Sequence, residues 1–170
     1  MFQFQPFNNC FTYTESRFCN NVQIPSLPLK GPKPFDEILR FICKAIEGEA
    51  ITAEFYCRLL KDAPNKLHQD FIQHAYRDEQ EHIQILTKLY FYYTDCDPKY
   101  EIKPIPCPCY RDGLLIALTG ELETVEFYRN IQLSTMDQVI IDTFYMIMID
   151  EQSHATMFST LFATCPFKDR

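Results

Sequence analysis

The sequence predicts an all-α fold, a four-helix bundle with a long crossover between its second and third helices. Apolar residues recur at spacings of three and four in four stretches, at about 35–61, 66–93, 112–133 and 136–163. The segment 95–111 contains four prolines and cannot be helical. The last two stretches also repeat features of the first two at a constant offset of 72 residues.

Length and composition predict one globular domain at 34–164, between an extended N-terminal arm (1–33) and a short C-terminal tail (165–170). The net charge of −7 argues against nucleic acid as a partner, because no basic patch would neutralise phosphates. The chain lacks an apolar run of the roughly 18 residues that a membrane span requires, so we expect no membrane partner. The N-terminus does not follow the pattern of a secretory signal, and we expect a cytoplasmic protein.

The first two stretches form a predicted hairpin. Pro34 suits the start of the first helix, because proline fits the first helical position. Asp62-Ala63-Pro64-Asn65 ends that helix, since proline cannot continue it. The second helix then follows to about residue 93. The third and fourth stretches form a second hairpin of the same kind, with helices that start near Asp112 and Met136.

The connection at 95–111 is long enough to span the bundle. About 17 extended residues at ~3 Å each reach ~50 Å, whereas a helix of about 26 residues is only ~40 Å long. The third helix can therefore start at the opposite end of the bundle from the end of the second. This crossover makes the first and third helices antiparallel and relates the two halves by a two-fold axis perpendicular to the bundle.

The repeat falls on side chains that bind metals. Each half contains a glutamate after a glycine and, thirty residues later, an Asp-Glu-x-x-His motif. The matched residues are Glu49 with Glu121, Asp78 with Asp150, Glu79 with Glu151, and His82 with His154. A glutamate and a histidine three positions later project from the same face of a helix, so both can reach one ion.

The four glutamates lie on the apolar stripes of their helices, which excludes a mere repetition of surface charge. Four uncompensated carboxylates in one core would cost several kcal/mol each or would take up protons. Two divalent cations offset the four charges. The sequence therefore predicts a dinuclear metal site, with the ligands Glu49, Glu79, His82, Glu121, Glu151 and His154.

With this ligand set the chain resembles the ferritin-like di-iron carboxylate superfamily. It is most similar in style to the rubrerythrin erythrin domain and to small ferritin-like proteins of spore-forming bacteria, over residues 35–163. The resemblance implies two iron ions, with manganese or a mixed Mn/Fe pair as the alternative. It implies that Glu49 and His82 bind one metal and Glu121 and His154 the other, while Glu79 and Glu151 bridge the pair.

Two departures from rubrerythrin bear on its peroxidase chemistry. The C-terminal rubredoxin module, with its two Cys-x-x-Cys pairs, is absent, so we expect an external electron donor. Thr124 stands where rubrerythrin has an extra glutamate. The eight cysteines of this chain are expected to be reduced thiols, or alternatively to form disulfides or a minor metal or redox site at Cys107-Pro108-Cys109.

The sequence also predicts roles for residues next to the candidate ligands. Asp78 and Asp150 occupy the place of the aspartate in the Asp-Glu-x-x-His motif of di-iron oxygenases. We expect Asp78 to accept a hydrogen bond from His154, and Asp150 from His82; the alternative is an ordinary surface position. Tyr56 and Tyr128 either hydrogen-bond to ligand carboxylates or simply pack. Together with Glu79 and Glu151, these tyrosines are the candidate catalytic residues. Residues expected to be solvated are Glu54, Glu81, Glu126, His68 and His74.

Two classes of function follow from the resemblance. One is a di-iron ferroxidase or peroxidase that reacts with O₂ or hydrogen peroxide in oxidative stress or iron handling, with a manganese-catalase-like enzyme as a variant. The other is a non-catalytic metal-binding structural component, for example of a spore coat, which assembles through its aromatic, cysteine-bearing arm. We expect a homo-oligomer, a dimer, with a spore-associated location as the alternative to a cytoplasmic one.

Overall fold

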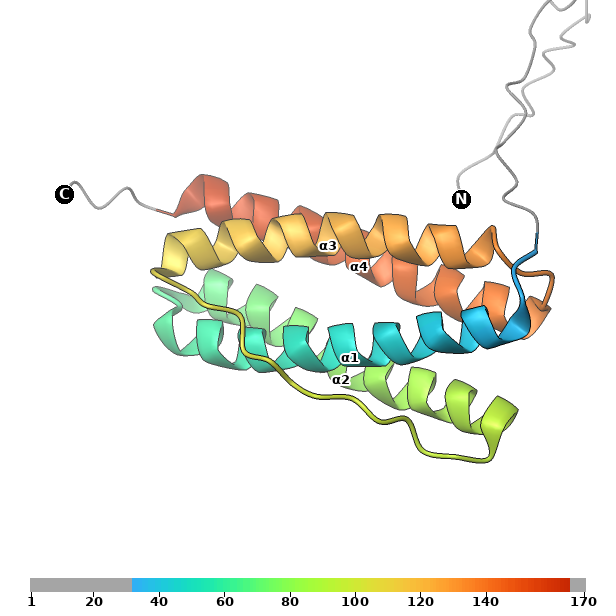
Figure 1. Cartoon of the computed structure of the whole chain (residues 1–170). Coiled ribbons are helices and arrows are strands. Elements are labelled where there is room, and N and C mark those ends of the chain that lie inside the picture. Colours follow the sequence, from blue (N-terminus) through green and yellow to red (C-terminus); the bar gives the residue numbers. More distant parts are fainter. Residues whose placement is uncertain (1–31, 166–170) are drawn as a thin grey trace, which may run out of the picture.

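The computed structural model describes residues 32–165 and confirms the all-α fold (Figure 1). Its four helices are α1 (Phe35–Leu59), α2 (Lys66–Thr94), α3 (Tyr110–Gln132) and α4 (Gln138–Thr164), and a short 3₁₀ turn, η1 (Leu60–Asp62), follows α1. Among these residues no helix is long and apolar enough to cross a membrane. The predicted arm up to residue 31, and the predicted tail from residue 166, lie outside the described residues.

Side chains cap three of the helices at their N-termini. Asn65 accepts a hydrogen bond from the backbone of α2, and Asp137 accepts two from the backbone of α4. At α3 the cap is a cysteine, because the Sγ of Cys109 accepts the backbone N–H of Asp112 at 3.5 Å. These caps explain why α3 starts two residues before the predicted Asp112 and α4 two residues after the predicted Met136.

The connection between α2 and α3 runs along the length of the bundle, as the crossover prediction required (Figure 1). It leaves α2 at Asp95, whose backbone is left-handed with φ of 51°. Near its far end the guanidinium of Arg58 in α1 donates a hydrogen bond to the carbonyl of Ile105 at 2.8 Å. As a result α3 is antiparallel to α1, and the two hairpins lie side by side.

The core consists of two apolar clusters, one toward each end of the bundle. The 72-residue repeat relates one cluster to the other: Ile42 and Ala45 belong to the first, and their counterparts Leu114 and Ala117 belong to the second. The middle of each helix lies between the two clusters. This arrangement places the repeated acidic residues and histidines in a layer that apolar side chains close off at both ends.

The prediction of a surface position for His68 is wrong. Its side chain is buried, with Nδ1 lying 2.7 Å from the Tyr110 hydroxyl and Nε2 lying 3.4 Å from Thr164 Oγ1. The first turn of α2 meets the start of α3 and the end of α4, and these neighbours cover the ring. Burial lowers the pKa of His68, because the charged imidazolium is poorly solvated there.

Five cysteines of the described region form no disulfide, and the redox state of all eight stays a prediction. Cys43, Cys57, Cys96, Cys107 and Cys109 are free thiols. The Cys107 thiol donates a weak hydrogen bond to the carbonyl of Cys109 at 3.4 Å. Burial raises the pKa of Cys107, which keeps this thiol protonated and poorly nucleophilic.

Candidate metal centre

The six predicted ligand residues come together in the middle of the bundle. Each is almost completely buried, with an exposed fraction between 0% and 3%. Helices α1 and α3 contribute one glutamate each, while α2 and α4 each contribute a glutamate and a histidine from one turn. The residues are Glu49 from α1, Glu79 and His82 from α2, Glu121 from α3, and Glu151 and His154 from α4.

These residues form two clusters that can each hold a metal ion. Within each cluster of four residues, the ligand atoms lie within 4.8 Å of one another. Glu79 and Glu151 belong to both clusters. The clusters are Glu49, Glu79, His82 and Glu151 on one side, and Glu79, Glu121, Glu151 and His154 on the other. This sharing has the same pattern as the bridged pair that the resemblance implies.

The imidazole of His82 faces the carboxylates of its cluster through Nδ1. This nitrogen lies 3.1 Å from Glu151 Oε1, 3.4 Å from Glu79 Oε2 and 3.9 Å from Glu49 Oε2. Nδ1 therefore points at both shared glutamates and at the glutamate of α1. The opposite ring nitrogen, Nε2, points out of the cluster.

His154 repeats this arrangement in the other half. Its Nδ1 lies 3.3 Å from Glu79 Oε1, 3.4 Å from Glu151 Oε2 and 3.8 Å from Glu121 Oε1. The two rings are 6.2 Å apart between centroids, with the shared glutamates between them. The local two-fold relation predicted from the repeat therefore extends to individual ligand atoms.

Several buried polar atoms at the centre lack a hydrogen-bond partner. They are both carboxylate oxygens of Glu79, Oε1 of Glu151, and the Nδ1 atoms of His82 and His154. A buried polar atom without a partner costs about 1–3 kcal/mol, and more when it is charged. Oxygen and imidazole nitrogen atoms that converge in this way suit a divalent cation such as iron, manganese or zinc. The residues therefore fit the metal pair that the sequence predicts.

Without cations, this centre must hold protons. Burial, reinforced by the charge of Glu151, raises the pKa values of Glu79 and Glu121 well above their ordinary range. Burial opposes the charged form of Glu151 as well, but its close contacts with the imidazoles of His154 and His82 lower its pKa to about 2. Burial lowers the pKa of His154, yet the close contact with Glu151 and the charge of Glu121 raise it to about 9. In place of the cations, protonated histidines thus supply positive charge and protonated glutamates remove negative charge.

Two tyrosines support the glutamates of the opposite hairpin. The hydroxyl of Tyr56 donates a hydrogen bond to Glu121, and that of Tyr128 donates one to Glu49. Both tyrosines are buried, and burial together with the partner glutamate raises each pKa well above its usual value. They are therefore neutral donors at physiological pH. Of the two alternatives for these residues, hydrogen bonding to candidate ligand carboxylates is the one observed.

Two aspartates orient the histidines from outside. Asp78 accepts a hydrogen bond from His154 Nε2 at 3.0 Å, and Asp150 accepts one from His82 Nε2 at 3.4 Å. Each bond joins α2 to α4, with the pairing expected from the sequence. Such a bond fixes the proton on Nε2 and leaves Nδ1 available as a ligand atom.

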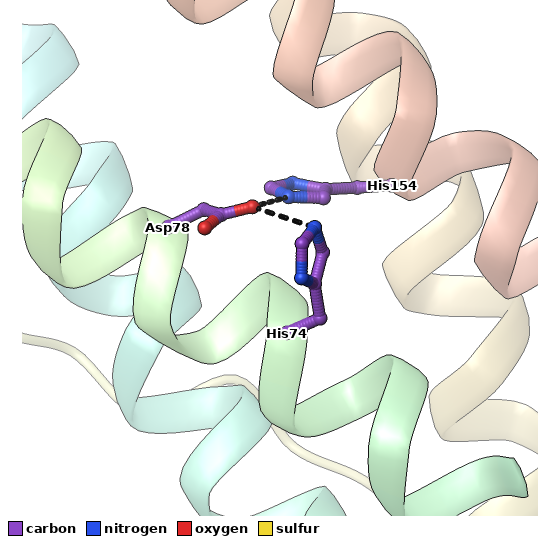
Figure 2. A group of neighbouring side chains, drawn as sticks. All are labelled: His74, Asp78 and His154. Atoms are coloured by element: carbon purple, nitrogen blue, oxygen red, sulfur yellow. Dashed lines mark hydrogen bonds and ion pairs between the residues drawn. The ribbon is translucent and has the colours of Figure 1, made fainter.

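His74 is the residue of this region that the sequence reasoning missed. Its side chain is exposed as predicted, but Nε2 lies 3.1 Å from the same Asp78 oxygen that His154 contacts (Figure 2). The sequence spacing could have predicted this contact, because His74 precedes Asp78 by four residues and therefore lies on the same helix face.

The other solvated positions lie apart from the clusters. Glu81 and Glu126 are exposed, as expected. Glu54 is partly buried and forms an ion pair with Arg58 at 2.8 Å on the surface of α1. None of these three glutamates belongs to a candidate metal cluster of the described residues.

The bundle has the ferritin-like fold. It is similar to a two-domain protein from Anabaena variabilis that contains DJ-1/ThiJ/PfpI-like and ferritin-like domains, with a TM-score of 0.66 and 15% sequence identity. The similarity covers 82% of this chain and 40% of that protein, so this chain spans less than half of the neighbour's length. No protein-family model matches the chain, and no curated protein does.

Proposed function

We propose that this chain is a dinuclear metal carboxylate protein that binds two iron ions and reacts with O₂ or hydrogen peroxide as a ferroxidase or peroxidase. One observation carries the proposal: two buried four-residue clusters share Glu79 and Glu151, and their unpaired oxygen and nitrogen atoms face one another. A structural role alone gives no reason to bury four carboxylates and two imidazoles in one layer.

Charge balance supports two divalent ions. The four glutamates supply four negative charges and the histidines can bind as neutral ligands, so two divalent cations bring the centre close to neutrality. The mixed oxygen and nitrogen donor set suits iron and also accepts manganese. When bound, the ions would supply the electrons that reduce O₂ or peroxide, and an external donor would restore them.

The side chains of the protein would perform the other parts of the reaction. Glu49 and His82 would hold one ion and Glu121 and His154 the other, while the two shared glutamates keep the positions at a fixed separation. The hydroxyls of Tyr56 and Tyr128 would hold the outer carboxylates in place and keep a proton beside each of them. The apolar clusters at both ends of the layer would limit the access of water.

Metal analysis of the native protein tests the binding half of the proposal. We expect about two ions per chain in the wild type and a loss of at least one in Glu79→Gln, because this glutamate belongs to both clusters. Glu81→Gln is the matched control, since Glu81 lies on the same helix but is exposed. Wild-type protein that binds no metal would refute the proposal.

Reaction with an oxidant tests the catalytic half. Protein loaded with ferrous iron should change its visible spectrum on addition of hydrogen peroxide or O₂, and it should turn over one of them when an external reductant is present. Reaction with peroxide alone would favour a peroxidase, and oxidation of added ferrous iron by O₂ a ferroxidase. Activity with manganese but not iron would favour the catalase-like variant. If the metal-loaded protein turns over neither peroxide nor ferrous iron, the non-catalytic structural role replaces the enzyme.

A further inference from the structure

The two candidate metal-binding clusters differ in the residues that support the outer nitrogen, Nε2, of their histidines. In one half, a single oxygen of Asp78 contacts both His154 Nε2 at 3.0 Å and His74 Nε2 at 3.1 Å (Figure 2). In the other half, Asp150 contacts His82 at 3.4 Å. The 72-residue repeat places Met146 where the first half has His74, and methionine cannot donate this hydrogen bond.

Exposure differs in the same direction. The side chain of Asp78 is 25% exposed, whereas that of Asp150 is 46% exposed. Water therefore competes more strongly for the carboxylate of Asp150. The longer contact of Asp150 with its histidine agrees with this difference. A carboxylate that is held more firmly orients its imidazole better and makes it a stronger ligand.

We propose that His74 is a positioning residue that holds Asp78 against His154 and so makes the metal position of His154 the tighter of the two. This inference rests on the proposed dinuclear site. It adds that the two ions are inequivalent and that they bind in order, first beside His154 and then beside His82. The inequivalence arises from a single departure from the internal repeat, His74 in place of a methionine.

A second donor to the same oxygen has an opposing effect, because it draws on the charge that Asp78 offers to His154. The geometry indicates which effect dominates. The side chain of His74 is 57% exposed, so its hydrogen bond is shared with solvent and withdraws little charge. The contact between Asp78 and His154 is nevertheless the shorter of the two aspartate–histidine contacts. The better orientation of His154 by Asp78 therefore outweighs the charge that His74 withdraws from Asp78.

Stepwise titration of the metal-free protein with Co²⁺ tests the proposal. Absorption of the bound ion reports the two affinities. The hyperfine-shifted N–H protons of the two histidines, seen by NMR, report which position fills, and the His154 signal is identified by its displacement in Asp78→Asn. We expect two unequal steps in the wild type, with the His154 signal appearing first. Loss of an aspartate that orients a ligand histidine typically weakens metal binding by about 10- to 100-fold. Loss of His74, which only holds that aspartate, should therefore lower the affinity of the first step by roughly 3- to 10-fold.

Three variants separate positioning from general packing. His74→Met gives the first half the residue that the second half has at this position. In this variant the affinity of the first step should fall, and the two affinities should become more similar. His74→Gln should retain unequal steps, because glutamine can donate to an aspartate four residues later. Met146→His should strengthen the second step, because it places an imidazole four residues before Asp150. Both substituted positions, 74 and 146, are exposed, so the fold should persist.

The outcomes distinguish this inference from the proposed function. Equal steps in the wild type, a His82 signal that appears first, or unequal steps that survive unchanged in His74→Met would each overturn the inference and leave the dinuclear site intact. A glutamine variant that binds like the methionine variant would overturn the hydrogen-bonding role of His74. A wild-type protein that takes up no Co²⁺ would overturn the dinuclear site and this inference together.

Discussion

Tyr128 in α3 donates a hydrogen bond to Glu49 in α1, a residue 79 positions earlier in the chain. Tyr56 and Glu121 form the reciprocal bond between the same two helices. The histidine–aspartate bonds join α2 to α4 in the same reciprocal way. The side chains around the candidate metal centre therefore also hold the two hairpins together, so the site and the fold depend on each other.

Replacing Tyr56 by phenylalanine should destabilise the metal-free protein. The substitution removes a buried donor and leaves the carboxyl group of Glu121 without its partner, at a cost of about 1–3 kcal/mol. Urea unfolding measures this loss. Tyr92→Phe is the control, because Tyr92 is 71% exposed. Equal stability of the two variants would show that the buried hydroxyl contributes packing alone.

Removing the charge of both outer aspartates should weaken metal binding. Asp78→Asn with Asp150→Asn removes the carboxylates that orient His154 and His82, and the affinity of each position should fall by about 10- to 100-fold. Competition with a chelator of known affinity measures the change, while circular dichroism verifies that the helices persist. Intact affinity would mean that these aspartates are ordinary surface residues.

Chelation of bound metal should lower the thermal stability of the protein. A ligand that binds the folded state at a free concentration 100 times its dissociation constant adds about 2.7 kcal/mol to the free energy of unfolding. Calorimetry with and without a chelator measures the shift. The double variant Glu79→Gln with Glu151→Gln serves as the control, because it lacks both shared ligands and should show no metal-dependent shift.

Glycine substitutions should have opposite effects at different helix positions. A Cβ at Gly113 would lie 2.6 Å from Leu59 Cδ1 and 2.8 Å from Cys107 Sγ, so Gly113→Ala should destabilise the junction of α3 with α1 and the crossover. A Cβ at Gly48 or Gly120 would meet nothing within 4 Å. Alanine at these two helical positions should stabilise the protein by up to about 1 kcal/mol. Urea unfolding of the three variants distinguishes them, and a stabilising Gly113→Ala would contradict the packing.

Protonation of His68 at acidic pH should lower the free energy of unfolding. Burial lowers the pKa of His68 in the folded state below its unfolded value of about 6.5. The contribution of the neutral ring is therefore fully present above pH ~6.5 and is lost as the pH falls through the folded pKa. The difference in unfolding free energy between wild type and His68→Asn, measured from pH 8 to pH 5, should shrink toward acid. A difference that does not change with pH would contradict this expectation.

The sequence was sufficient to predict the helices and the six candidate ligands, because both rest on local spacing. Glu79 and His82 share a helix face by their separation alone, and the repeat at Glu151 and His154 excluded coincidence. The crossover could be predicted from chain length and proline content. The assignment of these residues to two metal positions came from the resemblance to the ferritin-like di-iron carboxylate superfamily and not from the spacing.

Apart from the two aspartate–histidine bonds, contacts between distant segments could not be predicted in this way. The partner of Tyr56 lies 65 residues away, and the sequence left hydrogen bonding and packing equally open. The burial of His68 depends on Tyr110 and Thr164, which reach it from two other helices. The cap at α3 was missed because cysteine is an uncommon capping residue and its thiol is a weak acceptor. The burial of His68 and the cysteine cap both fall outside the repeat.

The crossover has a consequence for how the protein can be divided. It joins two hairpins that each supply half of the candidate ligand set and contact each other through reciprocal bonds. Two identical hairpins related by a true two-fold axis would present the same arrangement of carboxylates and imidazoles. The chain therefore has the architecture of two hairpins joined by the crossover, and peptides spanning 32–94 and 107–165 would each carry one half of the ligand set and of the reciprocal bonds.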